Sequence, residues 1–302
     1  MQATGTDIEL RGRILRARGR VVVLTGPAAC GKTDAAMGLY EHYAAERAAG
    51  CVLIAPTAGA AAAMRSRLLA RAGGVLAGPR ILTFVSLAEG ILAAAGTAAR
   101  VISPFRRQLL LQRIVDELAA GRKLSALGAV ADAPGLIVAL DRSIAELKRA
   151  AVEPEALARA VGEAPGKARD LLEVYRRYQQ ALRAEGLYDL EGRMWEARDR
   201  LAAIAPGKPL PGLEGVRALA VDGFTDFTPT QLQILRHAAG SLERVLITLP
   251  YVEDSRVRLW HWTHRTLNAI RPAFGADLEE IALTPARENP GCEKPGCRGL
   301  RR

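Results

Sequence analysis

The sequence lacks any long apolar segment. Although 49% of its 302 residues are hydrophobic, no uninterrupted run approaches the roughly 20 apolar residues that a membrane-spanning helix needs. The first residues also lack the apolar core of a secretory signal, because Asp7 and Glu9 lie among arginines there. We therefore expect a cytoplasmic protein without a membrane partner.

Cysteine is scarce, which argues against a metal centre built from thiolates. Cys30 and Cys51 lie beside apolar, strand-like runs and are expected to be reduced structural thiols. Cys292 and Cys297 lie in a tail rich in Gly and Pro. Their spacing fits half of a metal or iron–sulfur site, but no second pair completes it. The two histidines within 261–264 are joined by no carboxylate or cysteine in a ligand pattern, so we expect no metal there either.

Acidic residues are absent from positions 47–88, where Arg65, Arg67, Arg71 and Arg80 all fall. The whole chain carries a net charge of +10 and has a pI near 9.9. Such a balance favours anionic partners, nucleic acid above all, and a local field of one sign is more suggestive than a global excess. The alternative is a general preference for arginine in a GC-rich genome.

What the first hundred residues do contain is an alternation of short apolar runs with helical segments. Apolar runs that end at Gly or Pro are typical of buried parallel strands, and Ala-rich segments without Pro are typical of helices. Ser86 is a candidate N-cap for the helix after the third run. The predicted strands are 21–24, 51–55 and 81–84, and the predicted helices are 33–49 and 58–69. This alternation implies an α/β fold with a parallel sheet.

The pattern is helical almost throughout positions 103–205. Apolar residues recur there at three-to-four spacing on three faces. The faces comprise Leu109, Leu110, Ile114 and Leu118; Leu136, Leu140, Ile144 and Leu147; and Leu171, Leu172, Tyr175, Tyr178 and Leu182. A loop rich in Pro and Gly follows at 206–212, and strands return at 218–221 and 245–248.

We therefore predict an α/β domain that is interrupted by a large all-helical insertion. Residues 1–100 form the first part of the domain, 101–205 form the insertion, and 206–283 complete the domain. Residues 284–302 have no periodicity and are expected to be a disordered tail.

One motif predicts specific chemistry. The pattern G-x-x-x-x-G-K-T lies between a predicted strand and a predicted helix, which is the context in which it forms a P-loop. Its backbone N–H groups and the helix N-terminus would bind the phosphates of a nucleoside triphosphate, which we take to be ATP. Lys32 would reach the β- and γ-phosphates, and Thr33 would bind Mg²⁺. The motif comprises Gly26, Pro27, Ala28, Ala29, Cys30, Gly31, Lys32 and Thr33.

A second Mg²⁺ ligand is predicted at Asp222. This residue ends the strand at 218–221, where a Walker B aspartate would lie beside the strand that leads into the P-loop. The alternative is an ordinary aspartate in a turn. The next residue, Gly223, has no side chain to orient or deprotonate a water molecule.

The segment that contains Asp222 also carries a family resemblance. Residues 221–231, VDGFTDFTPTQ, resemble motif II of superfamily 1 helicases of the UvrD/Rep type. They are more similar still to the D-G-F-x-x-F-T-P-x-Q version in AddB-like subunits of the AddAB helicase–nuclease. Residues 52–57 resemble motif Ia, 82–87 resemble the T-F-x-S-L segment after it, and 175–190 resemble the Y-x-x-Y-x-x-x-L…D pattern of the helical 1B insertion.

This resemblance covers about residues 20–270 and implies a RecA-like motor domain, 1A, with its 1B insertion. It implies a subunit that serves double-strand-break repair and recombination, with single- or double-stranded DNA and an AddA-like helicase–nuclease subunit as partners. The chain looks like the first motor domain and its insertion alone.

The resemblance to motif Ia also implies DNA contacts. The candidates are Thr57, Arg65 and Arg67 after the second strand, and Thr83 and Phe84 after the third. Phe84 is a candidate to stack on a base, as aromatic residues of single-strand binders do. The alternatives are a core position for Phe84 and a solvated helix face for the arginines.

The sequence differs from that of active helicases at positions that matter for ATP hydrolysis. Gly223 replaces the glutamate that activates water in those enzymes, Thr225 replaces the glutamine after it, and motif III is absent. We therefore assign no catalytic residue and expect the chain to bind Mg·ATP but to hydrolyse it poorly alone. The alternatives are an active UvrD-like motor fragment and a P-loop kinase of small metabolites whose helical insertion is a lid.

Overall fold

The computed structural model describes residues 5–46, 49–74, 78–97, 99–162, 166–253 and 260–283. The chain divides into two compact units. The first unit comprises Met1–Ile81, Arg217–Asp226 and Glu243–Arg302, and the second comprises Leu82–Val216 and Phe227–Leu242. None of the described helices is long and apolar enough to cross a membrane.

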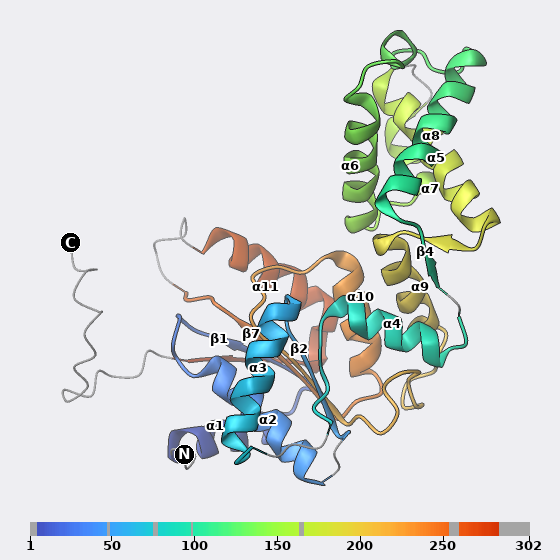
Figure 1. Ribbon diagram of the computed structural model, residues 1–302. Coiled ribbons are helices and arrows are strands. Elements are labelled where there is room, and N and C mark those ends of the chain that lie inside the picture. Colours follow the sequence, from blue (N-terminus) through green and yellow to red (C-terminus); the bar gives the residue numbers. More distant parts are fainter. Residues whose placement is uncertain are drawn as a thin grey trace. The chain divides into compact units, whose positions relative to one another are not determined.

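A six-stranded sheet lies at the centre of the first unit (Figure 1). Its strands are β1 (Val21–Thr25), β2 (Cys51–Ile54), β3 (Ile81–Leu82), β6 (Ala218–Val221), β7 (Arg244–Leu249) and β8 (Leu278–Ala282). The strand order is β3-β2-β6-β7-β1-β8. β1 runs parallel to β7 and β8, and β6 runs parallel to β2 and β7. Every residue of β1, β2, β6 and β7 is buried, as continuous apolar runs in a covered parallel sheet require.

The described part of the first unit contains four α-helices, which are α1 (Gly5–Arg16), α2 (Lys32–Glu46), α3 (Ala58–Arg71) and α11 (His261–Phe274). A short 3₁₀ turn, Gly275–Asp277, links α11 to β8. α2 packs on β2 and β6 and places Met37, Leu39 and Tyr40 in the core of the unit. The loop between β1 and α2 is therefore anchored at both ends by buried elements.

The second unit is mainly helical. Its helices are α4 (Phe84–Ala94), α5 (Pro104–Ala120), a 3₁₀ turn at Gly128–Val130, α6 (Leu136–Arg149), α7 (Pro154–Val161), α8 (Lys167–Ala184), α9 (Leu190–Ala202) and α10 (Pro229–Ala239). α5 packs on α6 and α8, whereas α4 and α10 pack on α9. Short strands β4 (Arg100–Val101) and β5 (Leu187–Tyr188) pair in parallel, and the helical periodicity gave no sign of this pair. Most of the described residues in 103–205 are helical, as predicted, but 121–135 form turns with one short 3₁₀ segment instead. The standing of 101–205 as an insertion stays a prediction.

The structure corrects two local predictions. Phe84 does not end a strand but begins α4, and the N-cap is Thr83 instead of Ser86. The extended backbone of Thr83 lets its hydroxyl accept the Ser86 N–H at 3.2 Å. On α5 the inward face includes Leu111, whereas Leu109 is 53% exposed, because the buried stripe is rotated relative to the predicted one. The predicted disordered tail 284–302, with both its cysteines, lies outside the described residues.

Candidate functional site

The loop that the sequence predicts to bind phosphate connects β1 to α2. Gly26 follows the last residue of β1, and α2 begins at Lys32. A Cβ atom at Gly26 would lie 2.7 Å from Cys30 Sγ and 2.9 Å from the Leu283 carbonyl oxygen, so only glycine fits there. Ala29 and Gly31 have left-handed backbone (φ 60° and 91°), a geometry in which successive N–H groups of a turn can converge on an anion.

The Lys32 ammonium is folded back onto this loop. Lys32 Nζ donates hydrogen bonds to the carbonyl oxygens of Gly26, at 2.8 Å, and Pro27, at 2.5 Å. It also lies 3.4 Å from Cys30 Sγ. The side chain is half-buried, so the positive charge is held at the mouth of the loop and stays in reach of solvent. The loop and its lysine therefore form one compact structure.

Asp222 lies where β6 ends and is bonded on both carboxylate oxygens. The Thr33 hydroxyl donates to Asp222 Oδ2 at 2.8 Å, and the Thr248 hydroxyl of β7 donates to Asp222 Oδ1 at 2.5 Å. Sequence reasoning missed Thr248, because a threonine inside an apolar strand gives no local signal of a polar contact.

The structure also corrects the placement of Asp222 relative to β1. We expected its strand to lie beside the strand that leads into the loop, but β7 separates β6 from β1. The carboxylate nevertheless reaches Thr33, because these parallel strands all end at the same edge of the sheet. The carboxylate, the two hydroxyls and the loop thus meet at the carboxyl ends of the strands, where ligands bind in open α/β sheets.

The electrostatics of Asp222 suit a cation. Asp222 is 2% exposed, and among the residues that the structure describes its carboxylate is bonded by hydroxyl groups and by no basic side chain. Two hydroxyl donors only partly compensate a buried carboxylate, and oxygen ligands of this kind are the ones that Mg²⁺ prefers. The described residues contain no group of three or more His, Cys, Asp or Glu that could hold a metal alone. A metal here would therefore take most of its ligands from phosphate and water.

Gly223 has a conformational reason to be glycine. Its φ is 86°, in the left-handed region that other residues rarely adopt, and a Cβ there would lie 3.4 Å from Pro56 Cδ. The position after Asp222 is therefore shaped for a residue without a side chain. A glutamate at this position would be strained as well as newly charged.

Three residues predicted to contact DNA lie in the first unit. Thr57 is exposed and caps α3, where its hydroxyl accepts the Ala60 N–H at 3.1 Å. Arg67 is exposed and pairs with Asp34 of α2 at 3.0 Å, while Arg65 donates to the Ile81 carbonyl oxygen at 3.4 Å. The positive charge of the stretch without acidic residues is thus partly neutralised by carboxylates of α2, which lie close to it in the fold.

The other two predicted contacts lie in the second unit. Thr83 serves as the N-cap described above. Phe84 is 4% exposed and packs edge-on to Phe227, with ring centroids 6.3 Å apart. These contacts fit the core alternative for Phe84. A role in DNA binding stays a prediction for all five residues.

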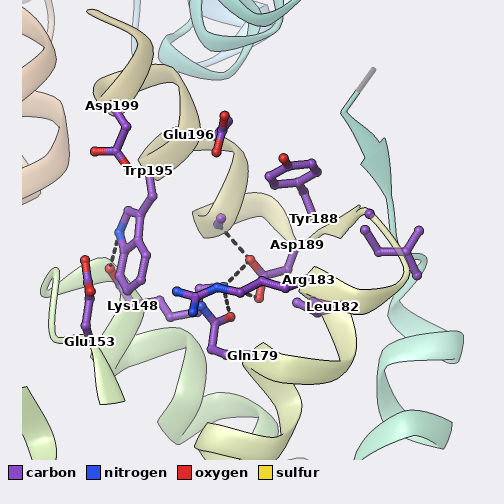
Figure 2. A pocket seen from close by; sticks show the side chains of 13 residues that line it. Lys148, Glu153, Gln179, Leu182, Arg183, Tyr188, Asp189, Trp195, Glu196 and Asp199 are labelled. Atoms are coloured by element: carbon purple, nitrogen blue, oxygen red, sulfur yellow. Dashed lines mark hydrogen bonds and ion pairs between the residues drawn. The ribbon is translucent and has the colours of Figure 1, made fainter. Parts of the chain in front are cut away.

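The second unit contains a pocket of about 220 Å³ that the sequence did not indicate (Figure 2). At its base the Lys148 ammonium, 1% exposed, lies 2.6 and 2.7 Å from the two carboxylate oxygens of Asp189 and 2.8 Å from Gln179 Oε1. The Tyr178 hydroxyl donates to Asp189 at 2.9 Å, and the Trp195 indole donates to the Lys148 carbonyl oxygen at 3.1 Å. Burial lowers the pKa of Lys148, although Asp189 opposes this shift. Because each charge is compensated, we interpret the cluster as structural.

The open and mainly parallel sheet, with polar groups gathered at the carboxyl ends of its strands, makes the first unit a Rossmann-like α/β structure. Residues 23–285 match the family model described as ADDB, N-terminal. The chain therefore belongs to the AddB N-terminal family.

Individual relatives agree with this assignment. A protein of Moorella thermoacetica is 29% identical over 290 residues, which cover 88% of this chain and 24% of the relative. Proteins of Pelotomaculum thermopropionicum and Desulforamulus reducens are 31% and 29% identical over 172 and 181 residues, each covering 56% of this chain and 15% of the relative. All three are named as subunits of an ATP-dependent helicase/deoxyribonuclease. The chain thus spans at most about a quarter of the length of these relatives (24%).

Proposed function

We propose that this chain is the nucleotide-binding and DNA-binding part of an AddB-type subunit in a helicase–nuclease complex of double-strand-break repair. In this proposal its first unit is a P-loop domain that binds Mg·ATP. An AddA-like subunit would be its protein partner, and single-stranded DNA would be its nucleic-acid ligand. Family membership supports the kind of complex, and the geometry around Asp222 supports the nucleotide.

The contact between Thr33 and Asp222 carries the nucleotide proposal. Thr33 follows the lysine of the loop after β1, whereas Asp222 follows β6, which lies two positions from β1 in the sheet. The two residues are far apart in the sequence, yet the hydroxyl and the carboxylate lie 2.8 Å apart. That pair is the ligand set through which P-loop proteins hold the Mg²⁺ of a bound nucleotide. When bound, Mg²⁺ would neutralise charge on the β- and γ-phosphates.

The loop would supply the remaining contacts to phosphate. Lys32 would exchange its hydrogen bonds with the Gly26 and Pro27 carbonyl oxygens for bonds to phosphate oxygens. The N-terminus of α2 would add backbone N–H groups and a favourable dipole. Both features bind phosphate without distinguishing among bases, so the choice of ATP rests on the family.

Hydrolysis is proposed to be slow in this chain alone. Hydrolytic P-loop enzymes position the attacking water and stabilise charge on the γ-phosphate, and each contribution is worth orders of magnitude in rate. Gly223 offers no side chain for the first task, and its left-handed backbone disfavours any replacement. Binding without rapid turnover is the expected behaviour.

A measurement of ATP hydrolysis with and without single-stranded DNA tests the proposal. ATP binding with little turnover in either condition is expected. Robust turnover that DNA stimulates and Lys32→Ala abolishes would instead favour an active UvrD-like motor. Phosphoryl transfer to a small metabolite that is indifferent to DNA would favour a P-loop kinase.

A further inference from the structure

The first turn of α11 carries an exposed aromatic surface that the proposed nucleotide site does not use. Trp262 is 69% exposed, although tryptophan is among the residues that gain most from burial. The Arg265 guanidinium lies over the indole, 5.4 Å from the ring centroid. The His261 ring meets the indole edge-on, with centroids 5.9 Å apart. We call these three residues the Trp262 surface.

Packing of the helix does not require this surface. The residues by which α11 is buried are Thr263, Thr266, Leu267, Ile270 and Phe274. Trp262 and Arg265 lie on the opposite, exposed side, so their contact does not contribute to packing of the core. The Arg265 guanidinium lies over one face of the indole, so a flat ligand would stack on the other face.

The charge around the indole indicates the kind of ligand. Arg265 pairs with no carboxylate among the residues that the structure describes, whereas Arg271, two turns further along α11, is matched by Glu280 at 2.7 Å. The first turn of α11 has no acidic residue, and the chain carries a net charge of +10. A protein segment seated here would need an acidic and aromatic face, while a nucleic-acid strand supplies both phosphate and a flat base.

We propose that the Trp262 surface binds single-stranded nucleic acid. The indole stacks on one base, and Arg265 contacts the neighbouring phosphate; His261 flanks the indole. This combination of an aromatic platform with a cation is how single strands are bound without sequence preference. None of the three residues belongs to the motif Ia contacts predicted from the sequence.

A hydrogen-bond link joins this surface to the segment after Asp222. The Thr266 hydroxyl lies 2.9 Å from the Thr225 carbonyl oxygen and 3.1 Å from the Trp262 carbonyl oxygen. The first turn of α11 is therefore fixed to the chain three residues beyond the candidate Mg²⁺ ligand. The inference thus extends the DNA-binding part of the proposed function and rests on it.

The test measures binding of the full chain to a short oligothymidylate and to an abasic strand of the same length and charge. Trp262→Ala is expected to weaken oligothymidylate binding about tenfold, the usual loss for one stacked base, and to leave abasic-strand binding unchanged. Trp262→Phe should retain most of the affinity. Arg265→Gln should weaken binding to both strands. Phe105→Ala, which removes another exposed aromatic residue (70% exposed) from the second unit, is the matched control.

Equal affinity of the wild type and Trp262→Ala for oligothymidylate would overturn the inference. In that case DNA binding by the wild type would still support the proposed function. A wild-type chain that binds neither strand would overturn both. Thermal unfolding of each variant checks folding, and no shift is expected because Trp262 is exposed.

Discussion

The Thr33 hydroxyl and the Asp222 carboxylate lie 2.8 Å apart although 189 positions separate them in the chain. The first residue follows the lysine of the loop after β1, and the second follows β6. Their contact brings two separately predicted motifs together in the fold. It also brings in Thr248, whose hydroxyl holds the other oxygen of the same carboxylate.

Removal of the Thr248 hydroxyl should destabilise the fold. Thr248→Val keeps the shape of the side chain but leaves one buried oxygen of Asp222 without its donor. We expect the free energy of unfolding to fall by about 1–3 kcal/mol, measured by urea denaturation. Thr248→Ser keeps the hydroxyl and should lose less. Equal stability of Thr248→Val and the wild type would show that the hydrogen bond contributes nothing.

Gly223→Glu should not create an efficient ATPase. The glutamate would occupy a backbone with φ of 86°, and this conformation costs a non-glycine residue about 1–2 kcal/mol. Gly223→Ala carries the same strain without the charge and serves as the control. Steady-state ATP turnover of both variants should stay at the wild-type level. DNA-stimulated turnover in Gly223→Glu alone would contradict the proposal that the backbone at position 223 keeps hydrolysis slow.

Combined replacement of Arg65 and Arg67 by glutamine should weaken binding to single-stranded DNA. If both arginines bind phosphates, the slope of log affinity against log salt should become shallower by roughly 0.7 for each phosphate that is no longer neutralised. Arg200→Gln, which removes an arginine of α9 with a 47% exposed side chain, is the control. An unchanged slope in the double variant would mean that these arginines only form a solvated face, with Arg67 engaged by Asp34.

Asp170 should make the second unit sensitive to acid. Burial alone would raise the pKa of its carboxyl, but hydrogen bonds from the Leu127, Ser125 and Ala126 N–H groups and the Ser125 hydroxyl outweigh burial, so the pKa lies below its ordinary value of 3.8. A carboxylate with a depressed folded-state pKa stabilises the fold above its unfolded pKa, and this contribution is lost as pH falls through the folded pKa.

Asp170→Asn is therefore expected to lower stability at neutral pH and to lose less stability than the wild type on acidification below about pH 4. Urea denaturation at several pH values measures both effects. The exposed Asp132→Asn provides the control. Parallel pH profiles for Asp170→Asn and the wild type would contradict the assignment.

The central strands could be predicted because each is buried on both faces. β1, β2 and β6 appear in the sequence as apolar runs that end at turn residues or at Asp222, and β7 is interrupted only by Thr248 after its first residue, Arg244. β8 gave no such signal, since its sequence LEEIA belongs to a strand at the edge of the sheet with only one buried residue. The predicted start of α4 was wrong. The apolar Phe84 continues the strand-like run before it, so the sequence pattern does not indicate Thr83 as the N-cap.

The candidate site at Thr33 and Asp222 could be predicted only in part, and for a different reason. Motif spacing singles out Thr33 and Asp222, and the fold brings them together, although their role in binding Mg²⁺ stays a prediction. Local sequence does not determine the order of strands in a sheet. The position of β7 between β1 and β6 could therefore not be predicted, and neither could the contact of Thr248 with Asp222. Lys148 likewise lies in an amphipathic helix, and its partner Asp189 follows 41 positions later.

Calorimetric titration with ATP, in the presence and absence of Mg²⁺, tests the central claim most directly. The wild-type chain should bind ATP more tightly with Mg²⁺. Asp222→Asn should lose this enhancement while it keeps metal-free binding, and Lys32→Ala should weaken binding in both conditions. If the wild type and both variants bind Mg·ATP with the same affinity, or if none binds it, the glycine-bounded loop and Asp222 do not form a nucleotide site.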